Sequence, residues 1–238
     1  MRPGMVFAAA AVAALCGQGG AQNVPGNQSG DPSAAVAAAA PGMESVVVDF
    51  TNPGLSPSHW TLTLHPDGTG HFHSEMGKPP AGGLEEIDTP NIDRNVQLSP
   101  HFAARVFAVA ERHNRFNENC ESRLKVAFQG WKKFTYTGPD GSGSCTFNFS
   151  KDKEIEALSD NMDAVAETIL EGERLEVLLE HDRLGLDKEM EFLVDAASSG
   201  RAQQICAIRG ILDRLAQDDE VMERVRKRAR MLLTQGDT

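Results

Sequence analysis

The feature that most restricts the fold of this chain is a Pro-Asp-Gly sequence that occurs twice, each time between two segments of alternating apolar and polar residues. The first copy lies in WTLTLHPDGTGHFHSE, residues 60–75, and the second in GWKKFTYTGPDGSGSCTFNFS, residues 130–150. A period of two is that of a strand with one buried face, and proline followed by glycine favours a tight turn. Each copy therefore predicts a β-hairpin, with a three-residue loop at 66–68 and a four-residue loop at 139–142.

The segments around the hairpins predict one further strand and two helices. A β-branched run at 44–50 is typical of a strand. Ser99 followed by Pro100 favours a helix start, and apolar residues recur at helical spacing after it and again over 155–169. The chain is therefore expected to have an α+β fold, an antiparallel sheet of two hairpins with two helices on one face, followed by an α-helical C-terminal region.

In this order of elements, roughly residues 44–170 resemble small secreted bacterial domains of unknown function. They are also similar in layout to the emfourin type of metalloprotease inhibitor. The likeness lies in the element order and the strand-turn pattern, so it transfers no functional residue. It implies a secreted protease as the partner, and the long connection at 77–99, rich in proline and acidic residues, is the segment we expect to contact it. The alternative is that this connection is unstructured.

The N-terminal residues carry a targeting signal. One arginine, an apolar run at 6–16 and small residues up to Ala21 have the layout of a secretory signal peptide, residues 1–21. Acylation at Cys16 is disfavoured because Leu15 precedes it where a small residue is needed. We therefore expect cleavage after Ala21 and a secreted or periplasmic protein.

The rest of the chain divides by composition into three parts. Residues 22–43 are rich in Ala, Pro, Gly and Ser, which predicts a disordered linker. A sheet domain is expected at 44–172 and a helical region at 173–238, and neither contains an apolar run long enough to span a membrane. The formal net charge of −11 argues against nucleic acid as a partner and leaves a protein or a cell-envelope component.

The first hairpin carries the most specific chemistry. Its predicted register places His65, His71, His73 and Glu75 on one face, and imidazole nitrogens with a carboxylate are suitable ligands for zinc. The alternative is that these residues form the solvated face of a sheet that is buried on its other side. The second interpretation is favoured, because the spacing matches no established zinc signature.

The cysteines indicate a structural crosslink. Once the signal peptide is removed, Cys120, Cys145 and Cys206 remain in an oxidising compartment. We expect Cys120 and Cys145 to be bridged, since both fall inside the sheet domain. Cys206 lies beside Ile205 on a helix and is expected to be a small buried side chain with a free thiol.

Motifs that would identify an enzyme are missing from the sequence. The chain contains no G-x-S-x-G, H-E-x-x-H, Walker loop or G-x-G-x-x-G sequence. A basic run at 224–230 is expected to complement a helix C-terminus rather than grip an anionic surface. The leading hypothesis is a secreted or periplasmic, non-catalytic binding protein of protease-inhibitor type without a cofactor. The alternative is a zinc-binding protein or metal-dependent hydrolase that uses the histidine face.

Overall fold

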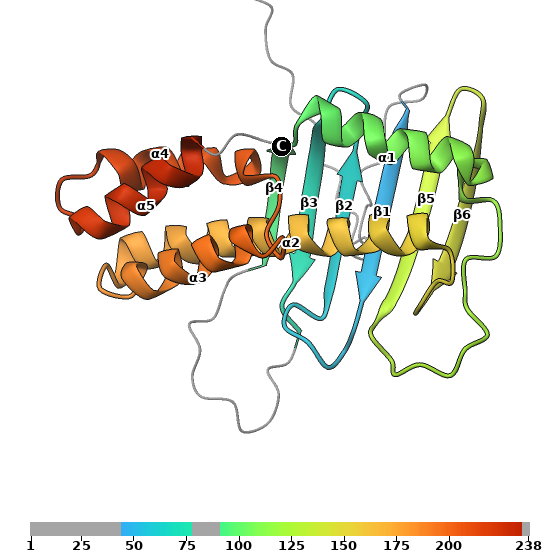
Figure 1. Ribbon diagram of the computed structural model, residues 1–238, viewed down its shortest axis with the longest axis horizontal. Helices are drawn as coiled ribbons and strands as arrows, with labels where there is room; N and C mark the ends of the chain where they lie inside the picture. Colours follow the sequence, from blue (N-terminus) through green and yellow to red (C-terminus); the bar gives the residue numbers. More distant parts are fainter. Residues whose placement is uncertain (1–43, 78–90, 235–238) are drawn as a thin grey trace, which may run out of the picture. The chain divides into compact units, whose positions relative to one another are not determined.

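The computed structural model describes residues 44–77 and 91–234, and within them six strands form one antiparallel sheet (Figure 1). Neighbouring strands follow the order β4-β3-β2-β1-β5-β6, so the two hairpins lie on either side of β1 and β4 extends the first of them. The strands are β1 (Ser45–Thr51), β2 (His59–Leu64), β3 (Thr69–Glu75), β4 (Ile92–Gln97), β5 (Trp131–Gly138) and β6 (Gly141–Phe147).

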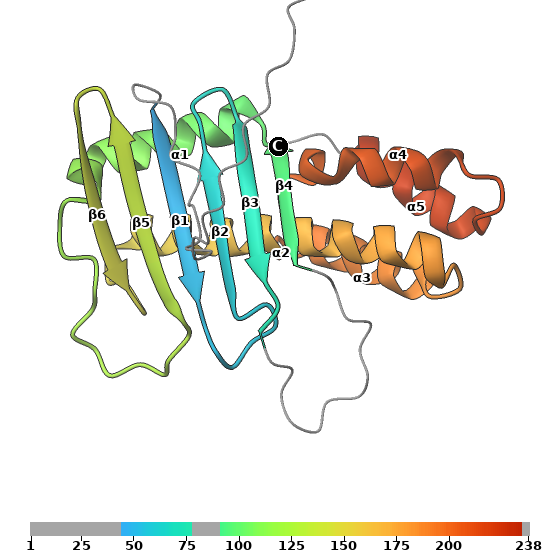
Figure 2. The ribbon, with the colours of Figure 1, turned by 180° about the vertical axis from the view of Figure 1, so that it is seen from behind.

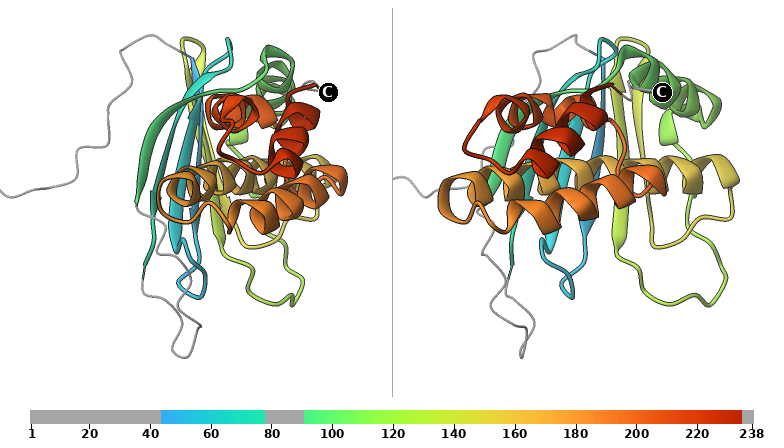
Figure 3. Two further views of the ribbon diagram at one scale, coloured as in Figure 1. Left: turned by 90° about the vertical axis from the view of Figure 1, so that its left-hand side faces the viewer. Right: turned by 60° about the vertical axis from the view of Figure 1, so that its left-hand side comes forward.

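Two helices cover one face of this sheet, α1 (Pro100–Arg112) and α2 (Lys153–His181). Figure 3 shows the sheet edge-on with both helices on the same side. The apolar side chains of the strands alternate toward these helices and form one core with them, and Leu62, Phe72 and Phe134 are fully buried there. The α+β class and the placement of two helices on one face are thus confirmed.

The first hairpin has the predicted register. Leu62 pairs with Phe72 and Thr63 with His71, and the N–H of His65 donates to the carbonyl of Thr69 across the three-residue loop.

In the second hairpin the faces are as predicted, but the register is not. Gly138 pairs with Gly141, which leaves a two-residue loop in place of the predicted four. Loops of two and four residues place the same side chains on the buried face, so alternation alone does not distinguish them. Gly141 has φ of +131°, a conformation open to glycine, and this permits the shorter loop.

The sixth strand, β4, lies inside the segment expected to be a loop at 77–99. Its inward positions are Ile92, Arg94 and Val96, so a charged residue interrupts the apolar alternation. Arg94 is accommodated because its Nη1 lies 3.4 Å from carboxylate oxygens of Glu173 and Glu176 on α2. The sequence pattern does not predict this strand, because Arg94 interrupts the apolar alternation. The acids that stabilise Arg94 lie some 80 residues further along the chain.

The C-terminal part is helical, as predicted. It contains α3 (Leu186–Ser198), the short 3₁₀ helix η2 (Ile205–Ile208), α4 (Arg209–Gln217) and α5 (Glu223–Thr234). Another short 3₁₀ helix, η1 (Asn114–Phe116), follows α1. Helix α2 enters both hydrophobic clusters, contributing residues up to Ile169 to the sheet core and residues from Leu175 to the helical one.

The boundary expected at residue 172 therefore lies inside a continuous helix. Gly172 is a point of close packing, since a Cβ there would lie 2.3 Å from Cγ2 of Ile208.

Several expectations fall outside the described residues. These are the signal peptide at 1–21, the linker at 22–43 and the part of the 77–99 connection that spans 78–90. Within the described residues, none of the helices has both the length and the apolar character needed to cross a bilayer.

The structure joins Cys120 to Cys145 as a disulfide, with Cα atoms 5.7 Å apart. Because the bond closes a loop with a sequence separation of 25, replacing both cysteines by alanine should lower the free energy of unfolding by about 2–4 kcal/mol. Chemical denaturation measures the loss. Reductant should destabilise the wild-type protein to the same degree and leave the double variant unaffected, whereas equal stability of the two proteins without reductant would show that the bond is not formed.

Candidate functional site

The second face of the sheet carries no helix among the described residues, and Figure 2 shows it from that side. Period-two alternation places threonines, serines, histidines and acidic residues there. Ionisable side chains gather on β1 to β4 in a single line, which we call the imidazole–carboxylate row. Its members alternate between imidazole and carboxylate and are His71, Asp93, His73, Glu75, His59 and Asp49.

Asp93 connects two histidines at one end of the row. Nε2 of His71 donates to Oδ1 of Asp93 at 2.9 Å, and Nδ1 of His73 donates to Oδ2 at 3.2 Å. The hydrogen bond from His73, followed by that from His71, lowers the pKa of Asp93 below its ordinary value. This carboxylate is therefore ionised at any pH near neutrality.

The other end of the row is built around His59. Its Nε2 donates to Oδ1 of Asp49 at 3.1 Å, and its Nδ1 lies 3.7 Å from Oε1 of Glu75. The same oxygen of Glu75 lies 3.6 Å from Nε2 of His73, which completes the line.

Strand register explains why these residues meet. His73 is opposite both Thr61 on β2 and Asp93 on β4, and Glu75 is opposite His59. Side chains directly across a strand pair, or diagonal to one, are within reach of each other.

The predicted set of His65, His71, His73 and Glu75 is only partly brought together. His65 lies at the turn end of the hairpin, where its Nδ1 donates to the backbone carbonyl of Glu44 at 3.0 Å. The structure puts His59, Asp49 and Asp93 in the row instead. His59 was detectable from its position two residues before Thr61 on the same face, but Asp93 was not, because its strand was not recognised.

This geometry favours ion pairing over metal coordination. The ring nitrogens face carboxylate oxygens along a line, whereas zinc requires ligands that converge on one point. In residues 44–77 and 91–234 no group of three or more His, Cys, Asp or Glu side chains is arranged to hold a metal ion.

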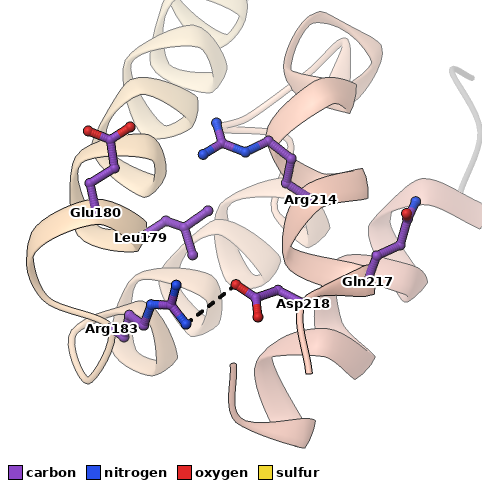
Figure 4. A pocket seen from close by; sticks show the side chains of 6 residues that line it. All are labelled: Leu179, Glu180, Arg183, Arg214, Gln217 and Asp218. Atoms are coloured by element: carbon purple, nitrogen blue, oxygen red, sulfur yellow. Dashed lines mark ion pairs between the residues drawn. The ribbon is translucent and has the colours of Figure 1, made fainter. Parts of the chain in front are cut away.

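A cavity of about 530 Å³ lies in the helical region and is lined by residues of both charges (Figure 4). Arg183 points across it toward Asp218 at 3.5 Å and also pairs with Glu220 at 2.7 Å. Arg214 lies 4.0 Å from Glu176. Because both arginines already have carboxylate partners, the cavity lacks the uncompensated positive charge that an anion site needs.

The most strongly shifted acid in the described chain is Glu171, buried between α2 and α3. Burial, followed by a hydrogen bond with Glu189, raises the pKa of Glu171 to about 9, although Arg174 opposes the shift with its Nη1 2.7 Å away. A shifted pKa is a marker of functional sites, but buried structural networks produce it too. Glu171 does not line the cavity described above, and its role is assigned to packing.

The basic run at 224–230 is paired with acidic side chains. Its expected place at a helix C-terminus is wrong, because the run begins at the second residue of α5 and the last turn of that helix has no basic residue. Four arginines of α5 contact acidic side chains of α3, of α5 itself and of the segment before α5. The pairs are Arg224 and Arg228 with Asp187, Arg226 with Asp219, and Arg230 with Glu223.

Comparison of the sequence with protein-family models finds no match, and a search of curated proteins finds none either. Function is therefore inferred from the geometry of the chain itself.

Replacing Glu171 by Gln should change how stability depends on pH. The unfolded chain loses this proton near pH 4.5, whereas the folded chain keeps it to about pH 9, so the wild-type free energy of unfolding falls across that range. At pH 8 the variant should be more stable than the wild type by roughly 1 kcal/mol or more, and at pH 4 equally stable. Denaturant titrations at the two pH values measure this, with the exposed Glu180→Gln as control. A stability difference that does not vary with pH would contradict the assignment.

Metal analysis decides between the two interpretations of the histidine face. Protein purified without a histidine tag is expected to contain no stoichiometric metal and to show no tight zinc binding by calorimetry, because the row pairs its nitrogens with carboxylates. Stoichiometric zinc that is lost on His71→Ala and retained on His65→Ala would refute this and favour the zinc hypothesis.

Proposed function

We propose that this protein is a non-catalytic binding protein of the secreted or periplasmic compartment, acting by contact with another macromolecule or a cell-envelope component. The observation that carries the proposal is the face of the six-stranded sheet that no helix covers in residues 44–77 and 91–234 (Figure 2). All six strands contribute side chains to it, and the disulfide ties the β6 end of the sheet to the segment after α1.

The form of this surface suits a macromolecule better than a small ligand. Small-molecule sites are concave and bury most of their ligand. The row lies on the face of the sheet, where the side chains of His71 and Asp93 are 41% and 69% exposed. A rigid scaffold with an exposed polar face is the arrangement by which many proteins present a recognition surface.

The proposed location has two supports. The layout of residues 1–21 is that of a secretory signal, and the Cys120–Cys145 disulfide is typical of oxidising compartments. The resemblance in element order to emfourin-type inhibitors makes a secreted metalloprotease the first partner to test.

Arginines introduced at the centre of the open face should abolish binding without unfolding the chain. Thr63→Arg with Thr135→Arg adds bulk and charge on β2 and β5, the strands on either side of β1, at positions that are only partly buried. Recovery of a partner from an extracellular or envelope fraction, and inhibition of a secreted metalloprotease, should both fall at least about tenfold. Gln217→Arg, at an exposed position on α4, is the matched control.

Two results would count against the proposal. One is equal capture and inhibition by the double variant and the wild-type protein. The other is turnover in a hydrolase screen that a single substitution abolishes.

A further inference from the structure

Two connections meet at one end of the sheet. Residues 52–58 join β1 to β2, and residues 117–130 lead into β5. They are neighbours because Thr51, the last residue of β1, is opposite Trp131, the first of β5, and Nδ2 of Asn52 donates to the carbonyl of Gln129 at 3.2 Å. In Figure 1 both connections extend below the lower ends of the strands.

This end carries most of the exposed large apolar side chains. Of the eight in the described part of the chain, five belong to these connections or to the first residue of β5. Phe128 and Trp131 are 53% and 50% exposed and touch edge to face, with ring centroids 6.0 Å apart. We call the five the apolar end patch: Leu55, Leu124, Val126, Phe128 and Trp131.

The two connections carry a charge opposite in sign to that of the whole protein. The chain contains 34 acidic residues and has a formal net charge of −11, yet residues 50–58 and 122–131 contain none of these acids. Arg123 and Lys125 are exposed there, between the apolar residues, and neither has a carboxylate within ion-pair distance in the described residues. The patch is thus both apolar and cationic.

The apolar side chains are held outward by an anchored loop. The side chain of Asn148 accepts from the N–H of Gln129 at 2.7 Å and donates to the carbonyl of Ala127 at 3.1 Å. The N–H of Ser122 donates to the carbonyl of Phe149, two residues after the disulfide at Cys120. Because both ends of the loop are fixed to β6 and the residues that follow it, exposure of Leu124, Val126 and Phe128 is built into the fold.

We infer that this end of the sheet inserts into the interfacial region of an anionic lipid bilayer. The inference rests on the proposed function and names its partner as a membrane surface. Segments that lie in the interface of anionic membranes typically combine tryptophan, phenylalanine and leucine with lysine and arginine. The patch sits on protruding loops rather than in a groove, and a bilayer accepts protruding side chains without needing a complementary pocket.

The negative net charge does not prevent this contact. At physiological ionic strength charges beyond about 8 Å are largely screened, so the membrane responds chiefly to the side chains that reach it. The carboxylates elsewhere on the protein then orient the molecule, because they favour presenting the two segments, 50–58 and 122–131, that contain no acids.

Vesicle binding tests the inference. The wild-type protein and all variants are recovered after export, so that they share the same N-terminus. The wild type should co-sediment with phosphatidylglycerol-containing vesicles and much less with pure phosphatidylcholine, and binding should weaken as salt rises. Leu124→Ser with Phe128→Ser, and separately Arg123→Glu with Lys125→Glu, should each weaken binding roughly tenfold or more. Leu184→Ser, and Lys188→Glu with Lys227→Glu, change equally exposed residues of the helical region and should leave binding unchanged.

Fluorescence provides a second reading. The protein has two tryptophans, and Trp60 is buried while Trp131 is half exposed. Anionic vesicles should shift the tryptophan emission to shorter wavelength and protect the exposed tryptophan from quenching by acrylamide.

Absence of vesicle binding, or binding that the loop variants do not reduce, would overturn the inference. Loss of a protein partner on altering Leu124 and Phe128, with no effect on vesicles, would also overturn it while leaving the proposed binding function intact. Failure of the open-face variants to affect any partner would count against the proposed function and not against the membrane contact.

Discussion

The packing of one face of the sheet against α1 and α2 is the interaction on which the rest of the structure depends. Phe72, Phe134 and Phe147 are fully buried in that layer together with apolar side chains of both helices. Burial of such side chains from water is the dominant favourable term in folding. Since strand side chains alternate, committing one set to the core commits the other set to solvent, and the imidazole–carboxylate row follows from this.

Helix α2 extends this constraint beyond the sheet. Its first part packs on the strands and its last part on α3, so one continuous helix links the two hydrophobic clusters. Arg94 of β4 reaches Glu173 and Glu176 near the middle of the same helix, which fixes the edge of the sheet to it. The close approach of Ile208 at Gly172 holds η2 against α2 at the point where the clusters meet.

The two surfaces proposed for binding differ in physical character. The open face is polar, with acids and imidazoles that hydrogen-bond to one another, and it suits contacts that depend on hydrogen bonds and charge. The apolar end patch combines aromatic rings with two cations, Arg123 and Lys125, that pair with no carboxylate among the described residues. It suits a membrane surface, whose headgroups are anionic and whose interior is apolar. Both are displayed by the same strands, because β1 ends where the first connection begins and β5 begins where the second connection ends.

The sequence by itself determined what depends on local periodicity and turn chemistry. Alternation around the Pro-Asp-Gly turns predicts both hairpins and their buried faces, and Ser99 before Pro100 predicts the start of α1, where the serine hydroxyl accepts from the N–H of Phe102. The first hairpin's loop length sets its register, so the pairing of His71 and His73 with the threonines of β2 also follows from local signals.

Only the tertiary structure decided what depends on residues distant in the chain. Strand β4 escapes prediction because Arg94 is stabilised by acids on α2, and Asp93 could not be placed beside His71 and His73 until β4 was known. The two-residue loop after Gly138 and the four-residue loop favoured by sequence differ by a shift that leaves every face unchanged, so only cross-strand pairing distinguishes them. The gathering of Leu55 with the loop before β5 likewise depends on β1 lying next to β5, a contact between segments about 80 residues apart.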